Sequence, residues 1–308
     1  MPGMLNCVDL QINGYLGHDF NGDDLADDAL HVICEQLARD GVAHFLPTVI
    51  TDELPVMQRR LARLVELRDG DPLAETMVSG LHIEGPFLNE TPGYIGAHPK
   101  EAARLADVDA MRRLLEAAGG LARIVTLAPE RDPGLRTTKM LADQGIVVAA
   151  GHCDPSLDEL RAAIDAGLSM FTHLGNGCPM QMHRHDNIVQ RVLSLADQLW
   201  VSFIADGAHV PFFALKNYLK LAGFERTVVV TDAISAAGQG PGRYRLAGWE
   251  IEIGEDLVPW APDRSHFVGS ASTMPRMIDN LRGHVGLTDA EIDRLVVENP
   301  GRILGLVG

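Results

Sequence analysis

Four residues with metal-binding or acid–base side chains lie in or directly after short apolar runs of the sequence. Glu84 lies in "VSGLHIEG", His152 ends "GIVVAAGH", His173 lies in "MFTHLGN" and Asp232 lies in "RTVVVTDA". Two imidazoles and a carboxylate suit a zinc-like divalent cation with one position left for water. A nearby aspartate that is not needed as a ligand can take the proton of that water and deliver it to a leaving group. Together these residues predict a metal-dependent hydrolase.

The segment 171–187, "FTHLGNGCPMQMHRHDN", is rich in polar side chains. It contains three histidines, one arginine, one aspartate, two asparagines and one cysteine. Taken alone, it fits part of a metal site, a binding site for an anionic substrate or a polar surface loop. The choice between these depends on the elements that position the segment.

Eight apolar or β-branched runs predict strands, and amphipathic stretches with helical spacing separate most of them. The runs are residues 7–14, 44–51, 78–85, 122–130, 145–152, 170–176, 200–209 and 226–233. This alternation predicts an α/β protein with a parallel sheet. Eight strands close a (β/α)8 TIM-type barrel, in which catalytic groups lie at the carboxyl ends of the strands. We predict such a barrel as one domain over residues 1–308, with a doubly wound open sheet as the second possibility.

Two segments interrupt the alternation of strands and helices. Residues 87–99, "FLNETPGYIGAHP", form a long loop rich in glycine and proline. Residues 238–269 are expected to form a loop and a hairpin, "YRLAGWEIEI", inserted after the eighth strand. Both segments would lie at the mouth of the barrel, where lids and specificity loops are common.

The composition limits the classes of partner. The 308 residues are 46% hydrophobic and carry a formal net charge of −16, which argues against nucleic acids and anionic membrane surfaces. No apolar run reaches the roughly 18 residues of a membrane span, and the first residues lack the pattern of a signal peptide. The four cysteines form no CxxC pair. These features predict a reduced, cytoplasmic protein.

The motifs taken together resemble the N-acetylglucosamine-6-phosphate deacetylase family of the amidohydrolase superfamily. The resemblance runs through "VDLQINGYLGHDF", "HIEGPFLN", "GAHPKE", "GHCDPS", "THLGNGCP", "IADGAHV", "VTDAISAAG", "VGSAST" and "ENPGRILGL", and so covers nearly the whole chain. It implies a metal-dependent barrel enzyme that removes the acetyl group from an N-acetylated amino-sugar phosphate. The expected substrate is N-acetylglucosamine 6-phosphate, which would yield glucosamine 6-phosphate and acetate. One divalent ion per chain, zinc, is the implied cofactor.

The resemblance also implies roles for individual residues. Glu84, His152 and His173 correspond to metal ligands. Asp232 corresponds to the general base and acid, and His98 to a residue that polarises the scissile carbonyl. The implied substrate contacts are Ala97, Asn176, Gly177, Arg184, His209, Phe267, Val268 and Gly269. Arg184 would grip the substrate phosphate, often across a subunit boundary in the family, so a homodimer is expected. His183, His185 and Asp186 are expected to orient this loop.

Three departures from the family pattern keep other functions open. Gln11 and Asn13 replace the HxH pair that builds a second metal site in many amidohydrolases, which favours one metal ion. The chain is also expected to lack most of the flanking β-sandwich of the family. The sequence "HRHDNIVQR" stands where the family has a Pro-Gly turn. The alternatives are therefore an amidohydrolase acting on an unphosphorylated N-acyl sugar or a cyclic amide, and a non-catalytic, metal-dependent sugar-binding protein.

Overall fold

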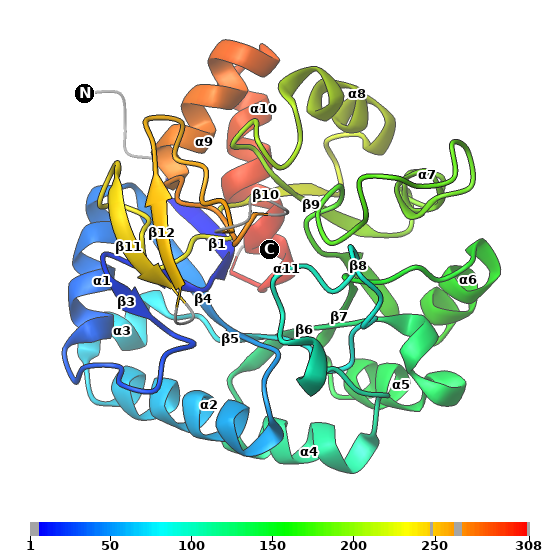
Figure 1. Ribbon diagram of the computed structural model, residues 1–308, viewed down its shortest axis with the longest axis horizontal. Helices are drawn as coiled ribbons and strands as arrows, with labels where there is room; N and C mark the ends of the chain where they lie inside the picture. The colour runs from blue at the N-terminus through cyan, green and yellow to red at the C-terminus, as the bar shows by residue number, and fades with distance from the viewer. Residues whose placement is uncertain (1–5, 247–248, 262–266, 307–308) are drawn as a thin grey trace.

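Eight parallel strands form the wall of a nearly closed barrel (Figure 1). The computed structural model describes residues 6–246, 249–261 and 267–306. In their order around the wall, the strands are β1 (Cys7–Ile12), β4 (Val42–Ile50), β5 (Leu81–Glu84), β6 (Ala122–Leu127), β7 (Val147–Ala150), β8 (Leu168–Phe171), β9 (Trp200–Ile204) and β10 (Thr227–Val230). A parallel bridge between Ile12 and Ala233 brings the two ends of the sheet together. The predicted α/β barrel is confirmed, and the open sheet is not.

Helices cover the outside of the barrel and explain why its strands are apolar on both faces. All six residues of β1 and all four of β5 and β10 are buried, as expected when helices pack outside and side chains fill the interior. The α-helices are α1 (Ala29–Arg39), α2 (Leu54–Asp69), α3 (Pro72–Met77), α4 (Val108–Ala117), α5 (Arg136–Asp143), α6 (Leu157–Asp165), α7 (Ile188–Leu193), α8 (Phe212–Ala222), α9 (Met274–Asn280), α10 (Asp289–Asp293) and α11 (Asn299–Ile303). Two π-helical turns, Leu281–Val285 and Arg294–Glu298, continue α9 and α10.

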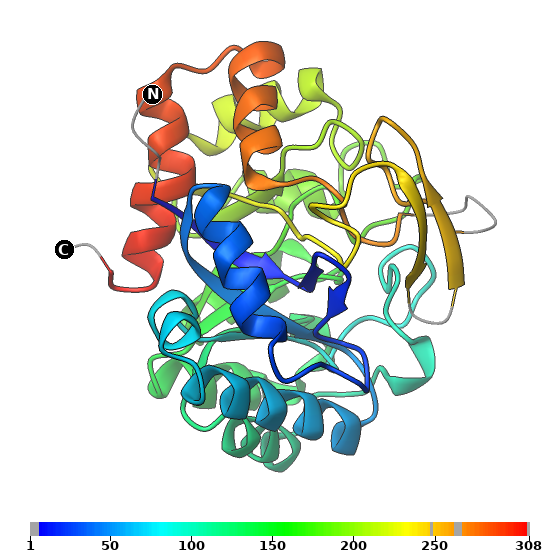
Figure 2. The ribbon, with the colours of Figure 1, turned by 90° about the vertical axis from the view of Figure 1, so that its left-hand side faces the viewer.

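Two short antiparallel pairs lie outside the barrel wall. Strands β2 (Gly14–Tyr15) and β3 (His18–Asp19) pair directly after β1. Strands β11 (Gly242–Leu246) and β12 (Trp249–Ile253) pair with Tyr244 opposite Ile251. Figure 2 shows this second pair beyond the end of the barrel toward which the strands run. Of the segment 238–269, residues 247–248 and 262–266 lie outside the described part.

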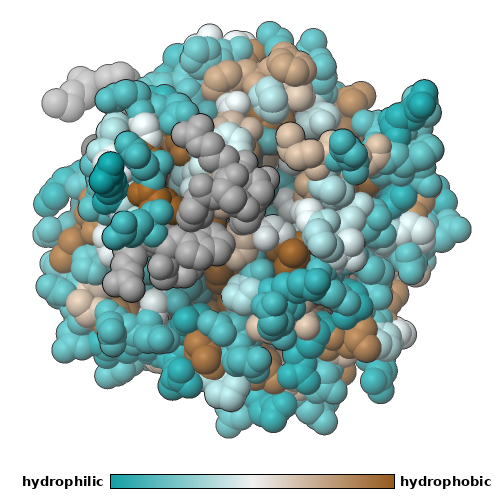
Figure 3. All heavy atoms as spheres, in the orientation of Figure 1, coloured by the Kyte–Doolittle hydropathy of each residue, from teal (hydrophilic) through white to brown (hydrophobic). Residues whose placement is uncertain are grey.

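Hydrophilic side chains predominate on the face of the molecule seen in Figure 3, with hydrophobic ones scattered among them. Among the residues that the structure describes, the large hydrophobic side chains that are exposed are Leu105, Met180, Phe213, Leu221 and Leu306. No described helix has the length and apolar character needed to cross a membrane. Most apolar residues thus lie in the barrel interior or in the layer between strands and helices.

Candidate active site

The carboxyl ends of three strands bring Glu84, His152 and His173 into contact. Glu84 is the last residue of β5, and the histidines follow β7 and β8 by two residues. The Oε1 atom of Glu84 lies 2.9 Å from His173 Nε2 and 3.4 Å from His152 Nε2. All three side chains are at most 5% exposed. The predicted ligands therefore form one buried cluster, as the barrel geometry requires.

The backbone is strained where these side chains leave the strands. His152, His173 and Asp232 have φ angles of +50°, +34° and +49°. Residues other than glycine rarely adopt this region, at a cost of roughly 1–3 kcal/mol each, and such strain clusters at functional sites. Six non-glycine residues of the described chain have positive φ, and half of them are these strand-end residues. This repetition at one end of the barrel is typical of a functional site.

A fourth cluster member, His98, comes from the glycine- and proline-rich loop 87–99. Its Nε2 lies 3.2 Å from His152 Nε2 and 3.9 Å from Glu84 Oε2. The same loop supplies the Tyr94 carbonyl, which lies 2.7 Å from His152 Nδ1. Asn89 donates its backbone N–H to the His152 carbonyl at 3.0 Å. The loop thus closes over His152 and holds it by both backbone and side chain.

The donor atoms of Glu84, His98 and His152 fit a divalent cation. Their ligating atoms all lie within 4.8 Å of one another, and all three residues are buried. When His152 donates its Nδ1 proton to the Tyr94 carbonyl, its Nε2 lone pair is left for a metal, which is the usual arrangement for a metal-bound histidine and its hydrogen-bond partner. His173 Nε2 lies 2.9 Å from Glu84 Oε1, the same oxygen that His152 approaches. This triad contains His98 in the place that the sequence assigned to His173, and His173 lies beside Glu84 but outside the triad.

Gln11 in β1 and Asn13 directly after it donate side-chain hydrogen bonds to two carboxylates of the site. Gln11 Nε2 donates to Glu84 Oε2 at 3.1 Å, and Asn13 Nδ2 donates to Asp232 Oδ1 at 2.7 Å. These are the positions where the sequence departs from an HxH pair. In this chain both amides act as hydrogen-bond donors that orient acids. Asn13 Oδ1 is buried and has no partner among the described residues.

Burial and neighbouring charges shift the pKa values of the site residues in different directions. Burial raises the pKa of Asp232 above its ordinary value, which suits a proton acceptor that must also donate. Burial acts in the same direction on Glu84, but bonds from His152 and His173 outweigh it and hold the pKa of that carboxyl well below its usual range. Burial lowers the pKa of His98 to about 3, so the ring is neutral. The two carboxyl groups of the site therefore differ, with the pKa of Glu84 lowered and that of Asp232 raised.

Two glycines leave room for the His152 ring. Gly177 has a φ of +59°, and a Cβ there would lie 2.8 Å from His152 Nδ1. Gly96 also has a φ of +59°, and a Cβ there would lie 3.1 Å from His152 Cε1. Ala97 follows directly in the same loop. The sequence singled out Gly177 but missed Gly96 and Tyr94, for which "PGYIGAH" carries only the signal of a flexible loop.

The remaining predicted substrate residues divide into two groups. His209 and Phe267 are together, with ring centroids 5.0 Å apart, although 58 positions separate them in the sequence. Val268 and Gly269 continue from Phe267, and the backbone N–H of Asn176 donates to the His173 carbonyl at 2.9 Å. Arg184 is exposed and has no ion-pair partner within the described residues. The structure therefore does not bring Arg184 into the buried cluster.

The loop around Arg184 is ordered by its own side chains. His183 Nδ1 accepts the backbone N–H of Asp186 at 2.9 Å, and Asp186 Oδ1 accepts from Arg191 Nε at 2.6 Å. Arg191 also donates to Asp154 at 2.8 Å, which ties the loop to the end of β7. The side chains of His183 and Asp186 thus orient the loop as predicted, whereas His185 takes part through its backbone N–H, which lies 3.4 Å from His183 Nδ1.

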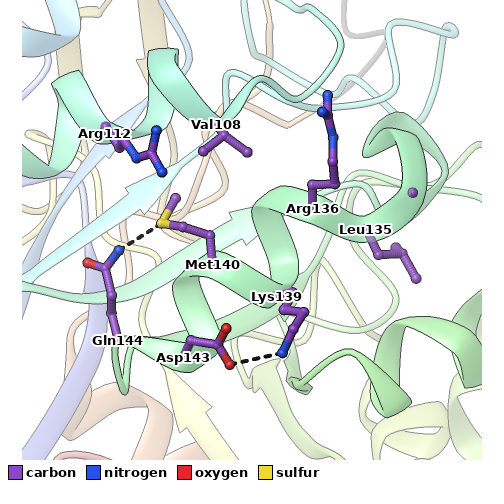
Figure 4. A pocket seen from close by; sticks show the side chains of 9 residues that line it. Val108, Arg112, Leu135, Arg136, Lys139, Met140, Asp143 and Gln144 are labelled. Carbon is purple, nitrogen blue, oxygen red and sulfur yellow. Dashed lines mark hydrogen bonds and ion pairs between the residues drawn. The ribbon is translucent and has the colours of Figure 1, made fainter.

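A separate surface groove of about 440 Å³ lies between α4 and α5 (Figure 4). Its cations are largely compensated within their own helices, because Lys139 pairs with Asp143 at 3.1 Å and Arg112 with Asp109 at 2.8 Å. None of the predicted site residues lines it. The chemistry is concentrated at the barrel mouth and not in this groove.

Comparison with known proteins places the chain among sugar-phosphate deacetylases, although no family model matches it. It is 32% identical over 302 residues to an N-acetylgalactosamine-6-phosphate deacetylase of Escherichia coli O157:H7, covering 98% of this chain and 78% of the relative. It is 30% identical over 308 residues to an N-acetylglucosamine-6-phosphate deacetylase of Bacillus subtilis (strain 168), covering 99% and 75%. A Mycobacterium smegmatis N-acetyl-D-glucosamine-6-phosphate deacetylase, solved as a mutant in complex with N-acetyl-D-glucosamine-6-phosphate, superposes with a TM-score of 0.87 at 29% identity, covering 98% and 77%.

Proposed function

The chain belongs to the N-acetylglucosamine-6-phosphate deacetylase family, and from this premise we propose that it hydrolyses the acetamide of an N-acetylated amino-sugar phosphate. The proposed substrate is N-acetylglucosamine 6-phosphate, and the products are glucosamine 6-phosphate and acetate. The observation that carries the proposal is the buried cluster of Glu84, His98, His152 and His173, which lies at the strand ends of a barrel whose relatives are deacetylases.

We propose one divalent metal ion per chain, zinc, held by Glu84, His152 and His173. Two imidazoles and a carboxylate are a common set for catalytic zinc. His98 lies close enough to serve as a further ligand or to face the substrate carbonyl. Such an ion supplies Lewis acidity toward the amide oxygen and lowers the pKa of water. The neutral amides Gln11 and Asn13 are poor ligands for such a cation, which supports a single metal site.

Asp232 is the proposed acid–base residue. It accepts one proton from the attacking water while the water oxygen bonds to the acetyl carbon. As the bond between that carbon and the sugar nitrogen breaks, Asp232 returns the proton to the nitrogen. The water's second proton stays on the new carboxyl group and passes to the amine, which gives acetate and the protonated amino sugar. The bond from Asn13 fixes one oxygen of the acid and leaves the other for this transfer. His98 is proposed to donate a hydrogen bond to the carbonyl oxygen as negative charge develops there.

The proposed substrate contacts surround this cluster. They are Ala97, Asn176, Gly177, Arg184, His209, Phe267, Val268 and Gly269. Arg184 is proposed to bind the phosphate, because a guanidinium matches two phosphate oxygens and the Arg184 side chain is exposed. Since it lies apart from the buried cluster, the phosphate contact is proposed to be completed in a homodimer.

Other features of the chain are also proposals. We propose a single barrel domain over 1–308, with the segment 238–269 as an insertion at the barrel mouth. A cytoplasmic location is proposed from the sugar-phosphate substrate. It is supported by four cysteines that are all free thiols.

Acetate release from N-acetylglucosamine 6-phosphate by zinc-loaded protein tests the function. The panel should include the galacto epimer, because one relative is named for N-acetylgalactosamine 6-phosphate, together with the unphosphorylated sugars and cyclic amides. Turnover of a cyclic amide with no acetate from any sugar would reject the deacetylase assignment. Tight sugar binding without turnover in metal-replete protein would instead indicate a binding protein.

A further inference from the structure

The loop that follows β9 contains a buried acid–imidazole pair, Asp206 and His209. Asp206 Oδ2 lies 2.6 Å from His209 Nδ1. The other oxygen, Oδ1, accepts the backbone N–H groups of Ala208 at 2.9 Å and His209 at 3.0 Å. The two side chains are only 3% and 2% exposed. Because both carboxylate oxygens are engaged by the same loop, the acid cannot rotate without losing hydrogen bonds.

The surrounding elements fix this loop from outside. The Ala205 carbonyl accepts from Asn280 Nδ2 of α9 at 2.9 Å. Gly207 has a φ of +83°, and a Cβ there would lie 2.3 Å from the Phe212 ring of α8. The Phe212 ring in turn stacks on His284 at 4.6 Å. The loop is therefore held in one conformation by two helices.

The second nitrogen of His209 is left without a partner. Nε2 is buried and makes no hydrogen bond among the described residues. Phe267 covers the ring at 5.0 Å, and Trp260 packs on Phe267 at 4.4 Å. Buried polar atoms are almost always hydrogen-bonded, so an unpartnered nitrogen on an otherwise fixed ring indicates a partner that arrives from outside. Burial acts to raise the pKa of Asp206, but His209 and the two backbone bonds hold it below its ordinary value, so the acid is an anion.

We propose that Asp206 is a positioning residue that keeps the proton of His209 on Nδ1 and thereby presents Nε2 to the bound sugar. When the imidazole is neutral, Nε2 then accepts a hydrogen bond from a sugar hydroxyl. This role rests on the proposed function, in which His209 contacts the substrate. It adds to that function a role for Asp206, an acid that contacts neither the metal cluster nor the sugar and acts through His209.

A double-mutant cycle tests whether Asp206 acts through His209. Asp206→Asn should lower kcat/KM by about tenfold to a hundredfold, the range seen when acids that orient functional imidazoles are removed. In a His209→Gln background the same change should alter kcat/KM by less than about threefold, because the residue through which it acts is gone. Bound zinc should remain at the wild-type level in every variant.

Asp132→Asn is the matched control. Asp132 is also a buried acid that caps its own loop, accepting the N–H groups of Thr137 at 3.2 Å and Thr138 at 2.7 Å, but it bonds no imidazole within the described residues. An equal loss of kcat/KM in this control, or an undiminished Asp206→Asn effect in the His209→Gln background, would reduce Asp206 to a structural residue.

A measurement without substrate separates this inference from the proposed function. Nitrogen-15 NMR of histidine-labelled protein, with His209→Gln to assign the signal, should show the wild-type ring protonated at Nδ1 and a changed pattern in Asp206→Asn. A wild-type ring that is neutral with its proton on Nε2 would overturn the inference even if deacetylation is fast. Absence of acetate release alongside the Nδ1 pattern would reject the proposed function and leave the pair intact. Because this readout uses the wild-type protein, it decides the question even if Asp206→Asn does not fold.

Discussion

Replacement of Gly177 by alanine should dislodge His152 and weaken metal binding. The His152 ring is held on three sides: by the Tyr94 carbonyl at 2.7 Å from Nδ1, by Gly96, and by His98 at 3.2 Å from Nε2. A Cβ on Gly177 would lie 2.8 Å from Nδ1, a separation that the ring can relieve only by giving up one of these contacts. We expect zinc affinity to fall about tenfold to a hundredfold, as when the outer support of a ligand histidine is lost.

The stability of the Gly177→Ala variant can be divided into two contributions. An alanine at a φ of +59° costs about 1–2 kcal/mol of unfolding free energy, and the steric conflict about 1–3 kcal/mol more, which gives about 2–5 kcal/mol in total. Gly145→Ala is the control, because Gly145 has a φ of +74° and no neighbouring atom within 4 Å of the position that a Cβ would take. It should lose only the backbone part and keep its zinc.

Denaturant unfolding of the metal-free proteins and competitive zinc titration measure the two quantities. Zinc binding by Gly177→Ala as tight as that of the wild type would refute the proposed steric conflict. A loss of stability no larger than that of Gly145→Ala would also refute the steric conflict, because the contact with His152 would then not destabilise the folded protein.

Four further outcomes are expected. Asp232→Asn should abolish acetate release while bound zinc stays near one per chain, and loss of the metal with the activity would make Asp232 a ligand. His173→Ala should lose bound zinc, whereas Gln11→Ala should retain most of it by metal analysis, since Gln11 only orients a ligand. Arg184→Ala should lower kcat/KM for the phosphorylated sugar by about tenfold to a hundredfold and leave the plain sugar nearly unchanged, and equal losses on both would remove the phosphate role. Burial raises the pKa of Asp9 from 3.8 to about 7. The contribution of this group to stability is therefore present below pH 4 and is lost as the pH rises through 7, by at most about 4 kcal/mol. Asp9→Asn should flatten the pH dependence of the unfolding free energy over that range, and an unchanged pH profile would count against this role.

The barrel could be predicted because its signal is local. Each strand is a short run of apolar residues, and each helix is an amphipathic stretch a few turns long, so periodicity alone locates them. The predicted runs contain all or most of seven strands of the wall and half of β8. The carboxyl ends of parallel strands meet at one end of a barrel. Placing Glu84, His152 and His173 together therefore required no knowledge of loop geometry.

Contacts made by the loops were decided only by the tertiary structure. His98 reaches His152 from a loop whose path the sequence does not specify, and the geometry makes it a potential ligand. Arg184 shows the opposite outcome, because a residue with a predicted substrate role lies exposed and apart from the buried cluster. Neither result follows from residue type, since a long loop can place its side chains in many directions.

By itself, the sequence determined the barrel, the strand-end acids and imidazoles, and the family to which they belong. The tertiary structure alone decided that Asn13 holds Asp232 across 219 positions, that Gln11 holds Glu84, and that Asp206 fixes His209. The physical reason is that a strand's position follows from the burial of its own residues, whereas a hydrogen bond between side chains depends on atomic distances. Those distances are set only when all eight strands have closed around the same axis.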